Sequence, residues 1–257
     1  MSRSLDIAFN AIENANEDEN GLTRRRLVTG AAATMGSMGL LGLAGNADKA
    51  MAANDPQTIL NVAATAEVLA TIVNTVGGER LVALNKRAKA RGKTIDKITL
   101  RNVQSAAREE LIHYDVLKSL GAVELTRSIW IPNEVFASKK SLLTTLEVGD
   151  QIFINAYLIG TTAFGNAGLG NQARFTGEFM GAEAVHRALA RQSLGKLGND
   201  RVFMQYTFTA IEDAVTMLQS AGFGFGQPGS KAGRFYAFDE VRQRTPNPVG
   251  INTLTPN

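Results

Sequence analysis

Both histidines of the chain follow a glutamate by three residues. Glu110 precedes His113 and Glu183 precedes His186 in a sequence of 257 residues. Residues three apart lie on the same face of a helix, so each pair could present a carboxylate and an imidazole to one point. These are ligands suited to iron, manganese or zinc. One Glu-x-x-His pair is a weak motif, but two pairs that include every histidine indicate a metal site.

Two further acids interrupt apolar stripes in other parts of the chain. In residues 56–76, Glu67 lies beside apolar residues that recur with the period of a helix. In residues 142–162, Asp150 takes a position within such a stripe, and Glu147 lies one turn earlier and partly shares its face. Either Asp150 or Glu147 could therefore be the acid that this segment contributes.

The two Glu-x-x-His pairs fall within helical segments of the same kind, residues 99–120 and 172–191. Four helices thus turn carboxylates and imidazoles toward one interior, whose inner positions carry no Lys or Arg. An ionised carboxylate buried without a partner costs several kcal/mol, and neighbouring carboxylates repel one another. Divalent metal ions would remove this conflict. Glu109, which points about 100° away from Glu110, is expected to be a surface charge.

The remaining segments are expected to cover this bundle. Residues 121–140 show no helical period, and so long a connection can run the length of a helix, which makes the second and third helices parallel neighbours. Residues 201–221 predict a fifth helix without chemically active residues. The tail from Gly222 is rich in Gly, Pro, Asn and Thr and predicts extended coil packed on the helices.

Composition excludes several classes of protein. The chain has no cysteine, so it can form neither disulfides nor thiolate-bound zinc or iron–sulfur sites. Its net charge of +3 is too diffuse along the sequence to indicate nucleic-acid binding. No unbroken apolar run is long enough to predict a protein with several membrane spans.

The first 52 residues resemble an export signal. Arginines at positions 24–26 precede the uncharged segment 30–45, and residues 50–52 supply the small-x-small pattern at which signal peptidase cleaves. The arginine pair, with an apolar residue two places on, resembles the twin-arginine motif. The resemblance implies passage through the twin-arginine translocase and a location in the periplasm or outside the cell. That route exports folded cargo, which favours a protein with a bound metal or cofactor.

The order acid, Glu-x-x-His pair, acid, second pair resembles the ferritin-like superfamily of di-iron and di-manganese carboxylate proteins. Arg108-Glu109-Glu110 with His113, and Asn155-Ala156-Tyr157-Leu158, are similar to exported bacterial ferritin-like-domain proteins related to plant desiccation proteins. The resemblance covers residues 56–195. It implies an all-α fold, a ferritin-like four-helix bundle with one long crossover and an additional C-terminal helix. Residues 1–52 would then be the signal peptide, 53–221 the bundle and 222–257 the packed tail.

The resemblance also implies a dinuclear iron or manganese centre. The ligands that it implies are Glu67, Glu110, His113, Asp150, Glu183 and His186. Glu110 and Glu183 would bridge the two ions, and each of the other four would bind one ion. Asp150 stands where the family pattern has glutamate, and its side chain is one methylene shorter.

Three functions are compatible with such a centre. The first is redox chemistry with oxygen or hydrogen peroxide, by a ferroxidase-like or peroxidase- or catalase-like di-metal oxidoreductase. In that case Tyr114 and Tyr157, on or near the inner faces, could donate hydrogen bonds or an electron. The second is a non-catalytic stress protein of the desiccation-related kind. The third is metal storage or delivery, and a storage cage would require assembly into a homo-oligomer.

Overall fold

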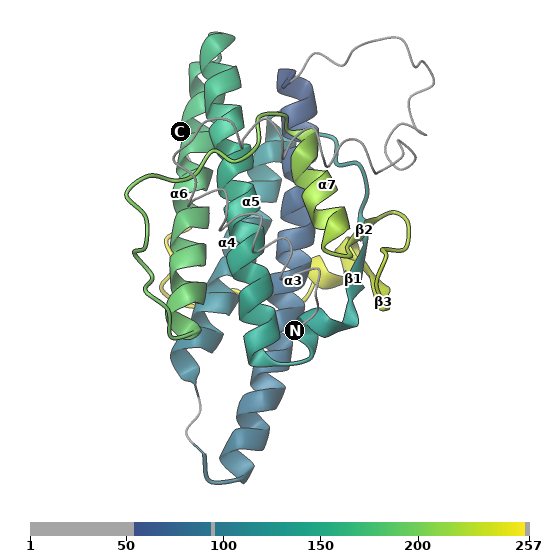
Figure 1. Ribbon diagram of the computed structural model, residues 1–257, viewed down its shortest axis with the longest axis vertical. Coiled ribbons are helices and arrows are strands. Elements are labelled where there is room, and N and C mark those ends of the chain that lie inside the picture. The colour runs from purple at the N-terminus through teal and green to yellow at the C-terminus, as the bar shows by residue number, and fades with distance from the viewer. Residues whose placement is uncertain (1–53, 94–95, 255–257) are drawn as a thin grey trace, which may run out of the picture.

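The computed structural model describes residues 54–93 and 96–254, and within them four long helices lie side by side along the long axis of the molecule (Figure 1). The helices are α3 (Pro56–Ala90), α4 (Lys97–Ser119), α5 (Lys139–Asn166) and α6 (Gly170–Ser193). Each contains one of the four segments for which the sequence predicts a helix. The chain is therefore mainly α-helical, as predicted. The predicted signal segment, residues 1–52, lies outside the described residues.

Side-chain caps set the start of three of these helices. Asp55, Asp96 and Ser138 each accept a hydrogen bond from the backbone N–H group three residues later, at 2.9–3.0 Å. Pro56 follows Asp55 at the beginning of α3, where the N–H group that proline lacks would have no helical partner. Each cap satisfies an N–H group of the first turn that has no partner within its helix.

The four helices form two antiparallel pairs. α3 packs on α4 and α5 on α6, and the pairs meet through α3 with α5 and α4 with α6. Thr99 at the start of α4 lies 2.8 Å from Ser193 at the end of α6, measured between their hydroxyl oxygens. Thr161 near the end of α5 lies 3.1 Å from Thr176 near the start of α6. α4 and α5 are therefore parallel, as predicted. The prediction that they are adjacent is wrong: among the described helices, each of them packs on α3 and α6, so they occupy opposite corners of the bundle. The connection between them crosses from one corner to the other.

The connection between α4 and α5 is structured rather than a plain loop. It contains strand β1 (Ser128–Pro132) and the 3₁₀ helix η2 (Asn133–Phe136). β1 pairs antiparallel with β2 (Gly224–Phe225) and with β3 (Gly233–Ala237). Trp130 donates from Nε1 to the Lys231 carbonyl at 2.9 Å, which ties the crossover to the C-terminal segment. The segment from Gly222 therefore contributes two strands to a sheet and is not only extended coil, as was expected. The sequence did not indicate these strands because they are too short to show a periodic pattern.

Residues 201–221 form a helix only in their second half. That helix is α7 (Glu212–Ser220), and a further short helix, α8 (Phe238–Arg242), follows β3. The irregular residues before α7 are held by Asn155 of α5, which is fully buried. Asn155 Oδ1 accepts from the N–H groups of Thr207 and Phe208, the latter at 3.3 Å, and its Nδ2 donates to the Phe208 carbonyl at 2.9 Å. The predicted fifth helix is shorter than expected because this side chain bonds backbone groups that a helix would use.

Alanine at position 155 is expected to destabilise the fold by about 3 kcal/mol, because buried backbone groups of residues 207 and 208 would lose their partner. Urea unfolding followed by circular dichroism measures this change. The matched control is alanine at Asn166, which is exposed at the end of the same helix. The control should change the free energy of unfolding by less than about 0.5 kcal/mol. Equal effects of the two substitutions would contradict the role of Asn155.

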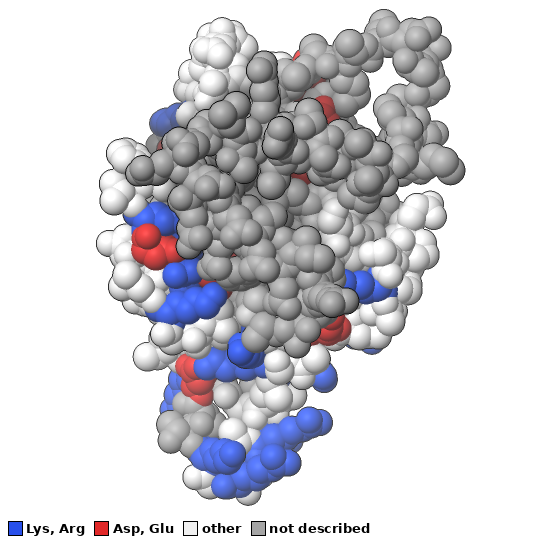
Figure 2. Space-filling view, viewed as in Figure 1, with Lys and Arg blue, Asp and Glu red and all other residues white. Residues whose placement is uncertain are grey.

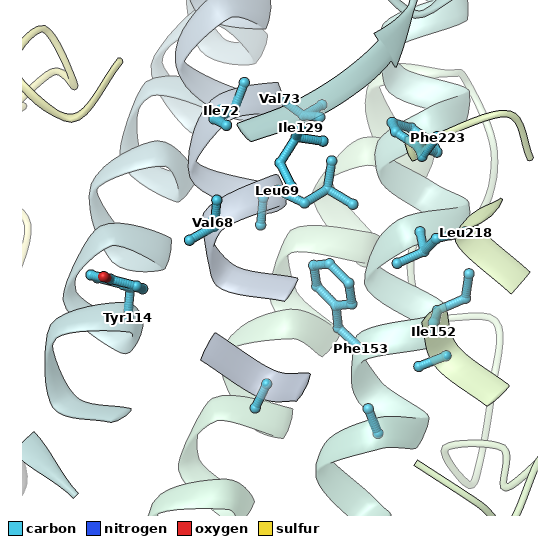
Figure 3. Packing of buried hydrophobic residues seen from close by; sticks show 14 of the residues in the cluster. Val68, Leu69, Ile72, Val73, Tyr114, Ile129, Ile152, Phe153, Leu218 and Phe223 are labelled. Atoms are coloured by element: carbon cyan, nitrogen blue, oxygen red, sulfur yellow. The ribbon is translucent and has the colours of Figure 1, made fainter. Parts of the chain in front are cut away.

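α3 is a central helix of the core. Figure 3 shows Val68, Leu69 and Ile72 of α3 among buried apolar residues of other elements, such as Phe153 of α5. A window of 18 residues in α3 has a mean hydropathy of 1.6, so its length and composition alone would allow it to cross a membrane. However, 89% of that window is buried inside the protein, as expected of a core helix. Glu67 therefore projects from a helix packed in largely apolar surroundings.

Candidate metal centre

Four buried side chains from three helices converge on one point between the helices. Glu67 extends from α3, Glu110 and His113 from α4, and Glu183 from α6. One ligand atom of each lies within 4.8 Å of the others. The three glutamates are fully buried and His113 is 8% exposed. This confirms the prediction that these carboxylates and this imidazole face a common interior, and such a group could hold a metal ion.

The second histidine faces the remaining oxygens of two of these glutamates. His186 Nδ1 lies 3.2 Å from Glu110 Oε1 and 3.5 Å from Glu183 Oε2. His113 Nδ1 lies 3.5 Å from Glu110 Oε2 and 3.9 Å from Glu183 Oε1. Each of the two glutamates thus turns one oxygen toward each histidine. Two carboxylates that bridged a pair of ions, with one histidine at each ion, would need this arrangement.

Each histidine also has a further acid on its side of the centre. Glu67 Oε1 lies 3.6 Å from His113 Nδ1 and accepts a hydrogen bond from the hydroxyl of Tyr157. Asp150 of α5 is 4% exposed and lines a small cavity together with His186. Glu67 thus lies near one histidine, and Asp150 shares a cavity wall with the other.

Most atoms that point into the centre have no hydrogen-bond partner. In the part of the chain that the structure describes, the buried atoms without one include both oxygens of Glu110 and Glu183, Oε2 of Glu67, Oδ2 of Asp150 and Nδ1 of both histidines. Buried polar atoms without partners are rare in folded proteins. Eight such atoms gathered in one place are the ligand atoms that carboxylates and imidazoles offer to metal ions, so the residues present fit such a centre.

Protons balance the carboxylate charges in the free protein. Burial raises the pKa of Glu67 to about 8, and the charge of Glu110 adds to this effect. Burial also raises the pKa of Glu183 and of Asp150 well above the ordinary range. For His113, burial alone would lower the pKa, but the nearby carboxylates of Glu110 and Glu67 outweigh burial and raise the pKa to about 10.

Glu110 differs from the other acids because it lies between both imidazoles. Burial would raise its pKa, but the charges of His186 and His113 close to it hold the pKa below the ordinary range. Burial would likewise lower the pKa of His186, yet the carboxylates around it raise the pKa well above its usual value. The free centre thus consists of an ionised carboxylate between two protonated imidazoles. Metal ions that displaced these protons would maintain the same balance of charge.

Glu147, the competing ligand in α5, is bound by cations instead. Its side chain is buried, and its oxygens pair with Arg191 and with Lys196, the latter at 2.9 Å. These contacts satisfy Glu147 outside the centre, whereas Asp150 Oδ2 has no partner. The structure therefore favours Asp150 over Glu147 as the ligand from α5.

One buried cation contradicts the prediction that the inner positions carry none. Arg187 of α6 is 4% exposed and forms two hydrogen bonds to Asp200, at 2.8 and 3.0 Å. Asp200 lies in the connection after α6, so the sequence pattern within the helix could not reveal this partner. Arg187 is thus paired with Asp200, and its charge offsets only part of the rise in the pKa of Asp150 that burial causes.

The prediction that Glu109 is a surface charge is also wrong. Its Oε2 lies 2.6 Å from Nε2 of His186, and the hydrogen bond lowers the pKa of Glu109. With the proton of the neutral ring held at Nε2, the lone pair of Nδ1 points toward Glu110 and Glu183. An acid that fixes the tautomer of a histidine in this way is typical of metal sites. The sequence did show an acid next to Glu110, but helical spacing alone places the side chain of Glu109 on a different face, away from the centre.

Alanine at position 109 is expected to weaken the binding of one metal ion by about 10- to 100-fold, because His186 would lose the partner that orients it. Isothermal titration calorimetry of the metal-free protein with Mn²⁺ measures the affinity for each of the two ions. Glutamine at position 109 retains an acceptor and should lose less affinity than alanine. An alanine variant that binds both ions with unchanged affinity would show that Glu109 does not act through His186.

Two small cavities reach the centre at Asp150. One is lined by Thr99 and Ser193 at the ends of α4 and α6 and by His186, with a volume of about 20 Å³ for the centres of water-sized molecules. The other, of about 40 Å³, lies between α3, α5 and α7 and is mainly apolar, with Phe153 in its wall. Such volumes admit water or a molecule of similar size. Each cavity can therefore hold a molecule of about the size of water beside Asp150.

Comparison of the chain with protein-family models, with curated proteins and with solved structures finds no match. Its function must therefore be inferred from the geometry of the centre. Of the six predicted ligands, four converge closely, His186 contacts two of these, and Asp150 lines a cavity beside His186. Glu109 contacts His186 and is the residue of this candidate site that the sequence pattern missed.

Proposed function

We propose that the chain is a ferritin-like di-metal protein that carries out redox chemistry with oxygen or hydrogen peroxide. The arrangement of Glu110 and Glu183, each with one unpartnered oxygen toward each histidine, carries this proposal. A centre for a single ion would not require a second imidazole directed at the far oxygens of the same two carboxylates. Four helices in two antiparallel pairs with a long crossover are also compatible with the ferritin-like arrangement.

Each helix has a distinct role in this proposal. Glu110 and Glu183 would be shared by both metal positions, Glu67 and His113 would contribute to one position, and Asp150 and His186 would contribute to the other. The carboxylate-rich set suits iron or manganese. When bound, a pair of such ions supplies two-electron chemistry with a small oxidant.

Neighbouring aromatic residues shape the His113 side of the centre. The ring of Phe179 lies 4.3 Å from that of His113 and 5.5 Å from that of Tyr157, measured between centroids. These buried rings exclude water from Glu67 and His113. The hydroxyl group of Tyr157 donates a hydrogen bond to Glu67. Burial raises the pKa of this tyrosine, so its hydroxyl group stays protonated at neutral pH. Tyr157 thus fixes the orientation of the Glu67 carboxylate.

Export through the twin-arginine translocase is part of the proposal and depends on the sequence of residues 1–52. The double substitution Arg24→Lys/Arg25→Lys is expected to retain the protein in the cytoplasm, since the translocase recognises the arginine pair. Cell fractionation with an antibody against the chain measures this. Unchanged export of the double variant would contradict this route.

Turnover by the metal-loaded protein tests the proposed chemistry. The purified chain, loaded with iron or manganese, is expected to oxidise Fe²⁺ in air or to decompose hydrogen peroxide. Asp150→Asn is expected to reduce either rate by removing a ligand at one position, and Glu147→Gln serves as the matched control. Two bound ions without turnover of either substrate would instead favour the non-catalytic stress protein or metal storage.

A further inference from the structure

The hairpin between α3 and α4 ends in a group of exposed cations, here called the basic tip. Its members are Lys86, Arg87, Lys89, Arg91 and Lys93. No acid occurs from position 80 to position 95 of the sequence. The hairpin projects beyond α5 and α6 at one end of the long axis (Figure 1), and Figure 2 shows Lys and Arg side chains gathered at that end. This end of the described structure therefore carries a local group of five cations.

The charges of the basic tip have no acidic partner among the residues that the structure describes. None of its five residues takes part in an ion pair among residues 54–93 and 96–254. The next acid along the chain, Asp96, caps α4 through the Thr99 N–H group and pairs with Lys139. Cations near the end of a helix stabilise its dipole, which accounts for Arg87 and Lys89. Arg91 and Lys93 continue the charge past the end of α3, so helix stability does not explain the whole group.

The shape and composition of this end favour a soft anionic surface as the partner. Residues 79–98 contain no aromatic side chain that could stack on a nucleic-acid base. Beside the cations, Ile98 is 76% exposed and Val82 is 47% exposed. A convex tip can bring few of its charges against a rigid partner, whereas lipid headgroups can move to meet each cation. Clusters of four to eight Lys or Arg on a helix are typical of binding to anionic lipids.

We propose that the basic tip binds the surface of an anionic phospholipid bilayer. The five cations contact lipid phosphates, and Ile98 enters the headgroup region beside them. Attraction of this kind contributes about fivefold in affinity for each Lys or Arg near the surface. The long axis of the molecule then points away from the membrane surface. The metal centre lies in the middle of the bundle and does not contact the membrane. This interaction does not depend on whether the centre binds metal.

Sedimentation of the full chain with lipid vesicles tests the proposal. The protein is expected to bind vesicles of equal parts phosphatidylglycerol and phosphatidylcholine but not vesicles of phosphatidylcholine alone. Lys86→Gln/Lys89→Gln/Lys93→Gln should reduce the partition coefficient on the order of 100-fold. The control variant is Arg174→Gln/Arg234→Gln/Arg244→Gln, which removes three exposed charges in α6 and in the C-terminal segment rather than at the hairpin, and should retain most of the binding. Circular dichroism verifies that both variants are folded.

Three results would overturn the proposal. They are equal losses in the two triple variants, absence of binding to the anionic vesicles, and binding to a short DNA duplex in preference to those vesicles. The third result would assign the basic tip to nucleic acid. Since none of the substituted residues lies at the metal centre, failure here would leave the proposed function untouched.

Discussion

Glutamine at position 110 is expected to abolish binding of both metal ions. Glu110 is the carboxylate with an oxygen near each histidine, so its loss affects both positions at once. Two ions, each present at about a thousand times its dissociation constant, stabilise the native protein by about 4 kcal/mol per ion. For a chain of this size that corresponds to an increase in melting temperature of roughly 20 °C. Elemental analysis and thermal unfolding with Mn²⁺ measure both effects.

Two variants in α5 control this experiment. Asp150→Asn is expected to bind one ion fewer than the unmodified chain, because Asp150 lies on the His186 side of the centre. Glu147→Gln is expected to retain both ions, because Glu147 is paired with Arg191 and Lys196. The role of Glu110 would be contradicted by a Glu110→Gln protein that still binds two ions. Loss of metal from the Glu147 variant alone would reverse the assignment in α5.

The second large effect concerns pH. Without metal, the free energy of unfolding is expected to fall as pH increases from about 5 to about 10. The pKa of Glu67 rises on folding to about 8 and that of His113 to about 10, so folding favours the protonated forms. This contribution is fully present below the pKa values of the unfolded chain and is lost as pH passes through the folded values. Glu183, Asp150 and His186 shift in the same direction.

Bound metal is expected to reverse this dependence, because metal ligands must lose their protons. The affinity for Mn²⁺ should increase over the same pH range, and each binding event should release protons into an unbuffered solution. The pKa of Glu110 is lowered, so that carboxylate is ionised throughout and contributes no change in this window. Urea unfolding of the metal-free and loaded protein at several pH values measures the difference. Stability of the metal-free protein that increased with pH would contradict the protonation states described here.

The helices and most of the centre could be predicted because both depend on local spacing. A helix places residues three apart on one face, so Glu110 with His113 and Glu183 with His186 are visible in the sequence. Glu67 was found for the same reason, since an acid stands out in an apolar stripe.

Contacts between distant segments could not be predicted in this way. Asp200 pairs with Arg187, and Asn155 bonds the backbone of residues 207 and 208. In both cases one partner lies in a helix and the other lies in an irregular segment outside that helix. The pairing of β1 with β2 and β3 joins segments about a hundred residues apart and depends on strands too short to show a period. Glu109 was missed because a long, flexible side chain can reach a partner that helical spacing does not indicate.

Anomalous X-ray diffraction from crystals grown with Mn²⁺ or Fe²⁺ tests most directly whether the acids and imidazoles hold a pair of ions. The expected result is two anomalous peaks between α3, α4, α5 and α6, roughly 3.5–4 Å apart. One peak should lie at His113 and the other at His186, with Glu110 and Glu183 between them. A single peak away from either histidine, or no peak in a fully folded protein, would contradict the dinuclear centre.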